Sequence, residues 1–287
     1  MTARKSESRG ARKARGNLRA APATRASRIA RDTRAAGSGA DWWKGYFTDD
    51  YLLEFEPIFD AREDRRQVAR LIELLGLPSG ARVLDVPCGQ GRHAHLLAEA
   101  GFSVDGLDYS PELLARAIAR GTDPDRLRYR RGDMRALPGK WAGKFDAVLN
   151  LFTSFGFFVD PADDERVIEG FARCLKPGGV LVWHGGSRDG VMARFLAKDW
   201  WRTSDGTQVG QERTFDALSG ILTIHSTFSG GPRAMPDREH RIRLYTATRL
   251  SELMRDAGLF VEGAYDAWQD SPLRRTSSEM LLVARKA

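Results

Sequence analysis

The sequence has only two cysteines, Cys88 and Cys174, among its 287 residues. Two cysteines cannot build a disulfide framework, so we expect a reducing, cytoplasmic compartment. No run of 18 or more apolar residues occurs, and we therefore predict no membrane-spanning helix. No apolar segment follows the basic start of the chain, so no secretory signal is predicted. No group of His, Cys, Asp and Glu has the spacing of metal ligands, and we expect no metal.

The remaining composition is that of an ordinary globular protein, with 42% hydrophobic and 29% charged residues. The formal charge of +7 is unevenly placed. Residues 1–40 hold eleven basic and two acidic residues, a net charge of +9, and the rest of the chain sums to −2. Because this tail has few large apolar side chains, we expect it to be disordered. A nucleic-acid arm, a transit peptide and a solvated extension all fit its composition.

Short apolar strands alternate with helical segments from residue 62 onward. Strands are expected at 82–86, 103–108, 127–131, 145–151 and 180–184, and helices at 63–75, from the turn 87–91 to 100, from 110 onward and at 163–175. Strands separated by helices predict a parallel sheet with helices on both faces. Two closing strands, 259–264 and 280–285, follow a helix at 247–257. The fold class is therefore α/β: a doubly wound, mostly parallel, seven-stranded, Rossmann-like sheet.

The C-terminal third contains a different pattern. Segments 211–216, 221–228 and 239–246 alternate polar and apolar residues, as half-exposed antiparallel strands do. We interpret them as a small antiparallel β insert after strand five. The domain prediction is a basic tail (1–40), a core with an N-terminal lid (41–203), the insert (204–246) and the C-terminal part of the core (247–287).

One segment combines a strand end, a glycine turn and a helix start. Asp85 closes the strand, Gly89 and Gly91 form the turn, and a helix follows. Glycines let the backbone approach a ligand closely, and a helix N-terminus favours an anion. A second acid, Asp108, ends the next strand, where a carboxylate typically accepts two ribose hydroxyls. The pattern indicates a nucleoside ligand, although the dinucleotide fingerprint G-x-G-x-x-G is absent.

These segments resemble the class I S-adenosylmethionine-dependent methyltransferases. The similar stretches are Asp85-Val86-Pro87-Cys88-Gly89-Gln90-Gly91, then 105–114, 131–135, 145–152 and 175–181, in the family's order. Pro87 stands where many members have glycine. The single-domain length and the β insert are similar to aminosugar and glycine-type N-methyltransferases, which act on small molecules.

The resemblance implies that S-adenosyl-L-methionine is the cofactor. It assigns the cofactor loop to Asp85, Pro87, Gly89 and Gly91, the ribose to Asp108, and the adenine to Tyr109, Asp133 and Met134. Asn150 would lie where the methionine moiety and the acceptor meet. The aromatic segment 42–47 would form a lid, with Tyr46 and Tyr51 as candidates, and simple packing of a helix on the core is the alternative.

The candidates for catalysis and acceptor binding are more dispersed. His184 ends strand five at the ligand-facing edge and is the best candidate base, with Asn150 and Tyr245 as further catalytic candidates. Phe152, Ser154 and Phe155 follow strand four and could form an apolar wall with a polar handle. Arg243 is placed on one strand face with Arg241 and Tyr245, and that face points into the cleft or into solvent.

The leading functional hypothesis is an enzyme that transfers a methyl group to a small-molecule acceptor, an amine or a hydroxyl. The alternatives are a methyltransferase acting on RNA or protein, with the tail as an electrostatic arm, and a non-catalytic cofactor-binding protein. The nearly neutral body argues against nucleic acid. We expect no membrane partner, and the insert could form a homodimer edge.

Overall fold

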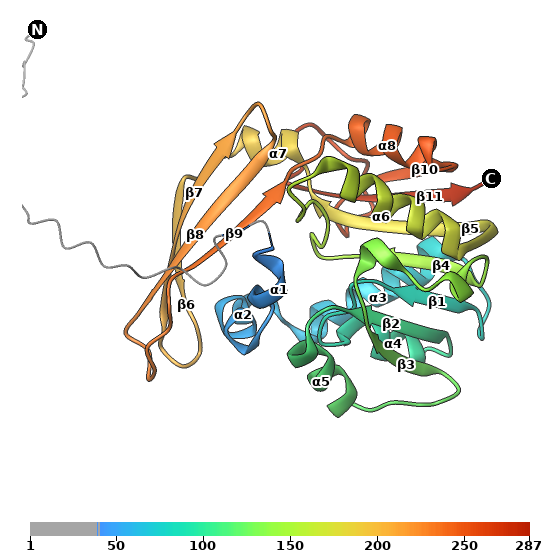
Figure 1. The fold of residues 1–287 in the computed structure, drawn as a ribbon, viewed down its shortest axis with the longest axis horizontal. Coiled ribbons are helices and arrows are strands. Elements are labelled where there is room, and N and C mark those ends of the chain that lie inside the picture. Colours follow the sequence, from blue (N-terminus) through green and yellow to red (C-terminus); the bar gives the residue numbers. More distant parts are fainter. Residues whose placement is uncertain (1–38, 40) are drawn as a thin grey trace, which may run out of the picture. The chain divides into compact units, whose positions relative to one another are not determined.

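The computed structural model describes Gly39 and residues 41–287 (Figure 1). The basic tail expected at residues 1–40 lies outside the described residues, apart from Gly39. No helix in the part of the chain that is described has the length and apolarity needed to cross a bilayer.

A seven-stranded sheet forms the centre of the fold, in the order β10-β11-β5-β4-β1-β2-β3. Its strands are β1 (Arg82–Asp85), β2 (Ser103–Asp108), β3 (Leu127–Arg131), β4 (Phe145–Asn150), β5 (Leu175–Gly186), β10 (Leu259–Asp266) and β11 (Glu279–Lys286). Strands β1 to β5 pair in parallel, whereas β11 runs antiparallel to both neighbours. The predicted seven-stranded, mostly parallel, Rossmann-like sheet is confirmed.

Both faces of the sheet are buried, which explains why its strands are almost continuously apolar. Neighbouring strand residues enter two different cores: Leu84 packs with α6 and α8, whereas Val83 packs with α3 and α4. The helices are α3 (Ala61–Leu75), α4 (Arg92–Glu99), α5 (Pro111–Ala119), α6 (Pro161–Cys174), α7 (Arg188–Ala193) and α8 (Ala247–Asp256). The sheet is therefore covered on both sides, as a doubly wound fold requires.

Local sequence signals set the helix bounds. The Asp60 carboxylate accepts from the Arg62 N–H and caps α3, which ends at Gly76 with φ 58°. The Ser110 hydroxyl accepts from the Leu113 N–H and caps α5. These two caps set the residues at which α3 and α5 begin.

A second, antiparallel sheet follows β5. It contains β6 (Lys198–Arg202), β7 (Gln208–Asp216), β8 (Ile221–Ser229) and β9 (Arg238–Arg243), paired in that order. The additional antiparallel sheet was expected, but it begins at Lys198, before the expected boundary at residue 204. Strand β6 carries no alternation, since four of its five residues are exposed, and the sequence pattern therefore missed it.

Two other strand bounds differ from the expectation. Strand β5 begins at Leu175, so it includes residues 176–179, which lie between the helix expected at 163–175 and the strand expected at 180–184. Leu175 pairs with Phe145 and Val180 with Ala147, so the extra residues form an irregularity in the pairing. Strand β9 ends at Arg243, and Tyr245 instead forms an isolated bridge with Ser187. The expectation that Tyr245 shares a strand face with Arg241 and Arg243 is wrong for this reason.

The N-terminal segment lies beside the second sheet (Figure 1). Its elements are α1 (Trp43–Tyr46), α2 (Asp49–Glu54) and one turn of 3-10 helix, Glu56–Ile58. The Trp201 indole N–H donates to the Glu54 carbonyl at 2.8 Å, which ties β6 to the end of α2. This segment is called the lid below, defined as residues 41–59.

Candidate functional site

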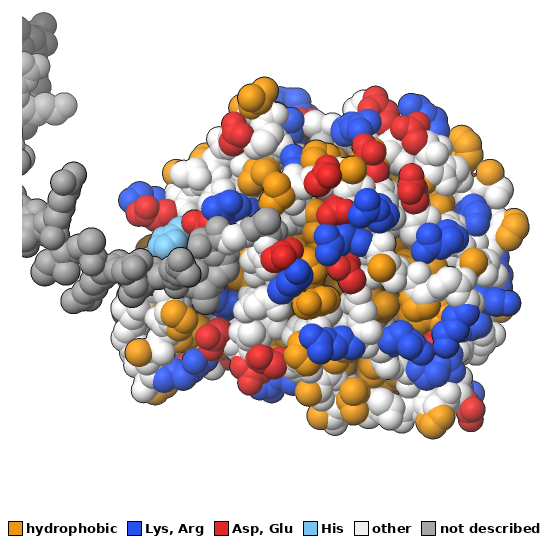
Figure 2. All heavy atoms as spheres, viewed as in Figure 1, with side chains coloured by type: hydrophobic (Ala, Val, Ile, Leu, Met, Phe, Trp, Pro, Cys, Tyr) orange, Lys and Arg blue, Asp and Glu red, His pale blue; other side chains and the backbone are white. Residues whose placement is uncertain are grey.

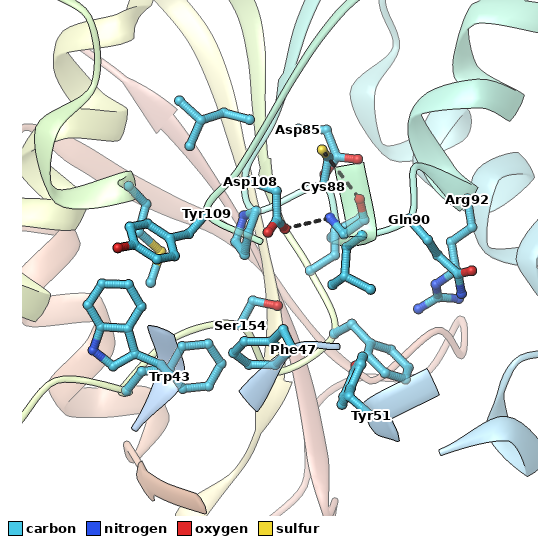
Figure 3. Close-up of a pocket in the computed structure, with 18 of the residues that line it drawn as sticks. Trp43, Phe47, Tyr51, Asp85, Cys88, Gln90, Arg92, Asp108, Tyr109 and Ser154 are labelled. Carbon is cyan, nitrogen blue, oxygen red and sulfur yellow. Dashed lines mark hydrogen bonds between the residues drawn. The ribbon is translucent and has the colours of Figure 1, made fainter. Parts of the chain in front are cut away.

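A cavity lies at the carboxyl edge of the parallel strands, between the seven-stranded sheet and the lid (Figure 3). Its wall comes from the lid, the β1–α4 turn, the end of β2, the segment after β3 and the loop after β4. The lining residues used below are Trp43, Phe47, Tyr51, Leu52, Phe59, Asp85, Pro87, Cys88, Gly89, Arg92, His93, Asp108, Tyr109, Leu113, Asp133, Met134, Phe152, Ser154, Phe157 and Phe158.

The β1–α4 turn brings backbone to the cavity. Gly89 and Gly91 have φ values of 54° and 74°, in the left-handed region that glycine adopts freely. A Cβ on Gly91 would clash with Tyr129 and Ala117, whereas one on Gly89 would have only Leu113 within 4.0 Å. Gly91 is therefore required for packing behind the turn, and Gly89 keeps space open in front of it. Pro87 follows a cis peptide bond and lines the cavity.

Asp108 connects the end of β2 with this turn. Its carboxylate accepts from the Gly89 N–H at 2.7 Å and from the Ser110 N–H at 2.8 Å. Burial raises the pKa of Asp108 to about 6, against the opposing effect of these backbone donors. Each carboxylate oxygen has two lone pairs, so both can accept a further hydrogen bond from a ligand.

Asp85 is the most isolated charge in the site. Its side chain is buried, and none of the hydrogen bonds among the described residues reaches its carboxylate. Burial raises the pKa of Asp85 to about 7, with Arg92 lowering it and Asp108 raising it further. A carboxylate in this position is complementary to a cationic ligand group.

Aromatic and polar groups form the opposite end of the cavity. Tyr109 and Trp43 meet edge to face with ring centroids 4.8 Å apart, and Met134 lies in the same wall. Asp133 is held by Arg135 at 2.7 Å. Burial raises the pKa of Asp133, but the hydrogen bonds from Arg135 outweigh this effect and the pKa falls overall. This end offers a flat apolar slot with a carboxylate at its edge.

The lid closes the cavity through other residues than Tyr46. Trp43, Phe47, Tyr51 and Leu52 line it, whereas Tyr46 does not. The Tyr46 hydroxyl donates to Glu54 Oε2 at 3.0 Å and lies 2.8 Å from His240 Nδ1. Tyr46 therefore holds the lid against β9 from the side that faces away from the cavity.

Arg92 and Phe59 were not among the residues expected to bind a ligand. Arg92 begins α4 directly after Gly91, and its Nη1 donates to Asp64. Its guanidinium lies over the Phe152 ring at 4.3 Å and near the Phe59 ring at 5.6 Å. The available signal for Arg92 was its place at the helix start after the glycine turn. No sequence pattern distinguishes Phe59, which reaches the cavity because the lid folds back.

The candidate catalytic residues His184 and Asn150 do not line the cavity but support its wall. The Asn150 amide donates to the Val86 carbonyl at 2.8 Å and to the Ser154 carbonyl at 3.2 Å. His184 Nδ1 accepts from the Phe152 N–H at 3.2 Å, and Nε2 lies 3.4 Å from Glu279. These bonds hold the loop after β4, where Phe152 has a φ of 61°.

The structure does not bring Tyr245, Arg243 and Phe155 to the cavity. The Tyr245 hydroxyl donates to Asp164 Oδ2 at 2.7 Å, in a buried contact with α6. Arg243 donates to the Ser219 and Val159 carbonyls at 2.6 and 2.9 Å. Phe155 is a core residue that packs on Trp183 and Tyr245. Of the expected acceptor residues, Phe152 and Ser154 line the cavity.

His93 reaches the cavity beside Arg92. Its Nε2 lies 2.8 Å from the Gln67 Oε1. Burial, followed by the charge of Arg92, lowers the pKa of His93 well below its ordinary value, so the ring is neutral near pH 7. Among the residues described, no group of three His, Cys, Asp or Glu side chains is arranged to hold a metal ion.

Residues 83–179 match the family model described as "Methyltransferase domain". A dTDP-3-amino-3,6-dideoxy-alpha-D-glucopyranose N,N-dimethyltransferase of Streptomyces fradiae is 28% identical over 239 residues, covering 74% of this chain and 86% of the relative. A glycine/sarcosine N-methyltransferase of Parasynechococcus marenigrum (strain WH8102) is 35% identical over 205 residues, covering 64% and 69%.

A solved methyltransferase structure has a similar fold. An amino pentose methyltransferase from Micromonospora echinaspora, solved with S-adenosylmethionine bound, superposes with a TM-score of 0.64. It is 24% identical, and the match covers 84% of this chain and 98% of that protein. At this identity the likeness concerns the fold alone.

Proposed function

The chain belongs to the S-adenosylmethionine-dependent methyltransferases, and on that premise we propose that it methylates an amine of a small molecule inside the cavity under the lid. The observation that carries this proposal is the closure of the cavity by aromatic lid residues directly opposite the β1–α4 turn. An acceptor that reacts there must fit between the lid and the loop after β4. A small molecule meets this condition more easily than a folded RNA or protein.

The cavity fits the cofactor in its polar groups and in its free space. A Cβ on Gly89 would project into open space next to the turn, so the absence of a side chain leaves room for a ligand. The buried Asp85 carboxylate lacks a donor among the described residues, as a site for a cationic group does. The Asp108 oxygens keep lone pairs for hydroxyl donors.

We assign the nucleoside part of the cofactor to the end with the aromatic slot. Asp108 would accept from the ribose hydroxyls, and Tyr109, Met134 and Trp43 would enclose the adenine. Asp133 lies at the edge of this slot and would accept from the adenine amino group. Its carboxylate is already oriented by Arg135, so the acceptor atoms need no rearrangement.

The methionine tail would then lie along the β1–α4 turn. Asp85 would bind its amino group, and the backbone at Gly89 would approach it closely. Asn150 fixes this region indirectly, because its amide joins the Val86 carbonyl before the turn to the Ser154 carbonyl in the loop after β4. Asn150 and His184 are therefore positioning residues in this proposal.

The bound cofactor supplies an electrophilic methyl group on a sulfonium. The chain's own contribution is to hold donor and acceptor in line, which can supply about 7–11 kcal/mol of the barrier. Phe47, Tyr51 and Leu52 exclude water from the reacting groups when the lid is closed. Phe152 and Ser154 face the cavity from the loop after β4, so they would flank the acceptor.

The apolar side chains of the lid and of the loop after β4 favour an amine over a hydroxyl as the acceptor. Apolar surroundings lower the pKa of a buried amine and leave it neutral, with a lone pair ready to attack. A hydroxyl needs a base, and the cavity's imidazole, His93, has a depressed pKa that makes it a weak one. The two curated relatives are named for N-methylation of an aminosugar nucleotide and of glycine or sarcosine.

The test is a methylation assay with the full chain and a panel of small amines that includes amino sugar nucleotides, glycine and sarcosine. Formation of S-adenosylhomocysteine together with a methylated amine, seen by mass spectrometry, supports the proposal. Hydroxyl analogues of each amine are the matched controls. Methylation of RNA or protein without any small amine contradicts it, as does cofactor binding with no methyl transfer.

A truncated chain that lacks residues 1–40 separates the first two outcomes. Small-molecule turnover that is unchanged by this deletion places the acceptor site in the body of the protein. Methylation of RNA or protein that depends on the tail supports the electrostatic-arm hypothesis instead.

A further inference from the structure

The antiparallel sheet meets the cavity only through other segments. None of the described residues from β6 to β9 lines the cavity, although the sheet lies beside the lid (Figure 1). The end of β9 touches residues 156–159 in the loop after β4. Two side chains of that loop, Phe157 and Phe158, line the cavity. This contact is therefore a route from the sheet to the acceptor.

Backbone atoms join β9 to the loop at Gly156. The Arg243 N–H donates to the Gly156 carbonyl at 2.7 Å. Gly156 has a φ of 85°, and a Cβ placed on it would clash with the Arg243 carbonyl oxygen. The strand and the loop can approach this closely because the loop has a glycine at the point of contact.

The Arg243 guanidinium reaches from the strand to the same loop. Its Nη2 donates to the Val159 carbonyl at 2.9 Å and to the Phe158 carbonyl at 3.5 Å. Its Nη1 donates to the Ser219 carbonyl, in the turn between β7 and β8, at 2.6 Å. The side chain is 11% exposed. Because a guanidinium presents its donors in a rigid fork, it holds the turn and the loop in one arrangement.

A carboxylate of α6 fixes this guanidinium. Asp164 is fully buried, and its Oδ2 lies 3.6 Å from the Arg243 Nε and accepts from the Tyr245 hydroxyl at 2.7 Å. Burial raises the pKa of Asp164 to about 6, against the opposing effects of the Tyr245 hydrogen bond and the Arg243 charge. The three residues, Asp164, Arg243 and Tyr245, are called the bracket below. The bracket ties α6 to the end of β9 and to the loop after β4.

We propose that Arg243 is a positioning residue for the acceptor, because the bracket holds Phe157 and Phe158 in the cavity wall. The inference rests on the proposed function, which places the acceptor between the lid and the loop after β4. Phe157 also meets Trp42 and Phe47 of the lid, with ring centroids 5.3 and 5.4 Å apart. The antiparallel sheet thereby influences the choice of acceptor without touching it.

The test removes the bracket without leaving an unpaired charge. Arg243→Gln alone leaves the Asp164 carboxylate buried without its cation, so the main variant is Arg243→Gln/Asp164→Asn. Arg243→Lys is the conservative variant. Arg241→Gln is the matched control, because Arg241 lies on the same strand and pairs with Glu239 instead. Calorimetric titration with S-adenosylhomocysteine counts the folded sites, so turnover is compared for equal amounts of folded protein.

The double variant should lose acceptor turnover and keep cofactor affinity. We expect kcat/KM for the amine identified by the panel assay to fall about 10- to 100-fold, as a displacement of about 1 Å in a positioning group can cause. The affinity for S-adenosylhomocysteine should stay within about twofold, because none of the polar contacts assigned to the cofactor involves the bracket. Arg243→Lys should regain part of the turnover, and Arg241→Gln should equal the wild type.

Hydrogen–deuterium exchange reports on the loop without any acceptor. In the double variant, residues 152–160 should lose protection, whereas the β1–α4 turn should keep it. Unchanged turnover, with or without a change in protection, overturns the proposal. Equal losses of turnover and of cofactor affinity also overturn it, since they indicate a general structural role.

The control and the wild type complete the test. A loss of turnover in Arg241→Gln as large as in the double variant overturns the assignment to Arg243. If the wild-type chain methylates no amine of the panel, the proposed function fails. Exchange in residues 152–160 then still decides whether the bracket holds the loop, and unchanged protection overturns that contact as well.

Discussion

Glu54 in α2 and Arg238 in β9 form a buried ion pair, with Oε2 and Nη1 3.2 Å apart. Glu54 also accepts from the Ser226 and Tyr46 hydroxyls at 2.6 and 3.0 Å. The Arg238 guanidinium lies over the Tyr46 ring at 4.0 Å. The lid is therefore fastened to the antiparallel sheet by a polar network, while its aromatic face covers the cavity.

Breaking this ion pair should loosen the lid. Arg238→Met leaves the Glu54 carboxylate buried without its cation, a change that costs about 3–5 kcal/mol in comparable cases. We expect faster tryptic cleavage at Lys44 and Arg62 and faster dissociation of S-adenosylhomocysteine. Glu54→Gln/Arg238→Met should recover part of the loss, because no unpaired charge remains. Cleavage and dissociation rates equal to those of the wild type would show that the network does not hold the lid.

Alanine at the two turn glycines should have different effects. Gly91→Ala forces Cβ into Tyr129 and Ala117, so we expect a lower melting temperature and weaker binding together. Gly89→Ala meets only Leu113 at 4.0 Å, so its stability cost is the backbone strain of about 1 kcal/mol. Its methyl group occupies ligand space, and cofactor affinity should fall strongly. Thermal unfolding and calorimetry measure the two effects, and parallel losses in both variants would contradict the distinction.

Asp108→Asn should weaken cofactor binding by about 1.5–3 kcal/mol, which is roughly 10- to 150-fold in affinity. The carboxamide keeps one acceptor oxygen but lacks the negative charge of the carboxylate, to which we assign the hydrogen bonds from the ribose hydroxyls. Asp105→Asn is a matched control, because Asp105 lies on the same strand but pairs with Arg82 and Arg128 outside the cavity. It should lower stability and leave affinity unchanged. Unaltered affinity in Asp108→Asn would remove the ribose assignment.

The affinity for S-adenosylhomocysteine should rise with pH around neutrality. Asp85 has a pKa of about 7 because of its burial, so it is protonated in the free protein below that pH. An ammonium ligand binds the ionised carboxylate, so affinity falls as pH falls and binding releases a proton near pH 6. Asp85→Asn should remove the part of this dependence that comes from Asp85 and leave the part that comes from Asp108, whose pKa is about 6. Calorimetry in buffers of different ionisation enthalpy counts the released protons, and the count should be lower for 5′-methylthioadenosine, which lacks the amino group and keeps only the ribose contact with Asp108.

The same shift makes Asp85 a cost to folding. Its pKa is about 7 in the folded chain against an ordinary 3.8, so the folded state binds the proton more tightly. Folding stability therefore falls as pH rises from about 4 to 7, by up to about 1.4 kcal/mol for each pH unit, and the cost is complete above pH 7. Asp85→Asn should unfold at a higher urea concentration than the wild type at pH 8, with little difference at pH 4. A less stable variant at pH 8 would contradict the raised pKa.

Local pattern was sufficient for the core of the fold and for the cofactor turn. The strand bounds of β2 and β3, the cap at Ser110 and the turn at Gly89 and Gly91 all follow from neighbouring residues. These features depend on periodicity, capping and backbone freedom, which act over a few residues. The same reasoning placed Asp85 and Asp108 at one edge of the sheet, and both line the cavity.

Long-range packing decided what the sequence missed. Tyr46 and Tyr51 were equivalent as lid candidates, yet Tyr51 faces the cavity and Tyr46 faces Glu54 and His240. Strand alternation placed Tyr245 on a face that points into the cleft or into solvent, but the strand ends at Arg243 and the Tyr245 hydroxyl donates to buried Asp164. His240 is 194 residues from Tyr46, and Asp164 is 81 residues from Tyr245, so contacts distant in the chain help to set both orientations.

The charged side chains on the protein surface are arranged differently from those that line the cavity. Figure 2 shows Lys and Arg side chains interspersed with Asp and Glu on the visible face of the described residues. One basic stretch includes Arg82, Arg128, Arg130, Lys140 and Lys144 at the other end of the sheet strands. Two of these, Arg82 and Arg128, are paired with Asp105. Electrostatic attraction of a polyanion would act there, away from the lid.

The fastening of the lid to the antiparallel sheet limits how this protein can be recombined with its relatives. Segment 198–243 supplies Arg238, Ser226 and Gln211 to Glu54, which belongs to a different part of the chain. A chimera that takes only residues 198–243 from a relative keeps Glu54 of this chain but replaces the side chains that pair with it. The Glu54 carboxylate would then be buried without its partners. To exchange acceptor preference with a relative, the lid (residues 41–59) and the antiparallel sheet must therefore be replaced together.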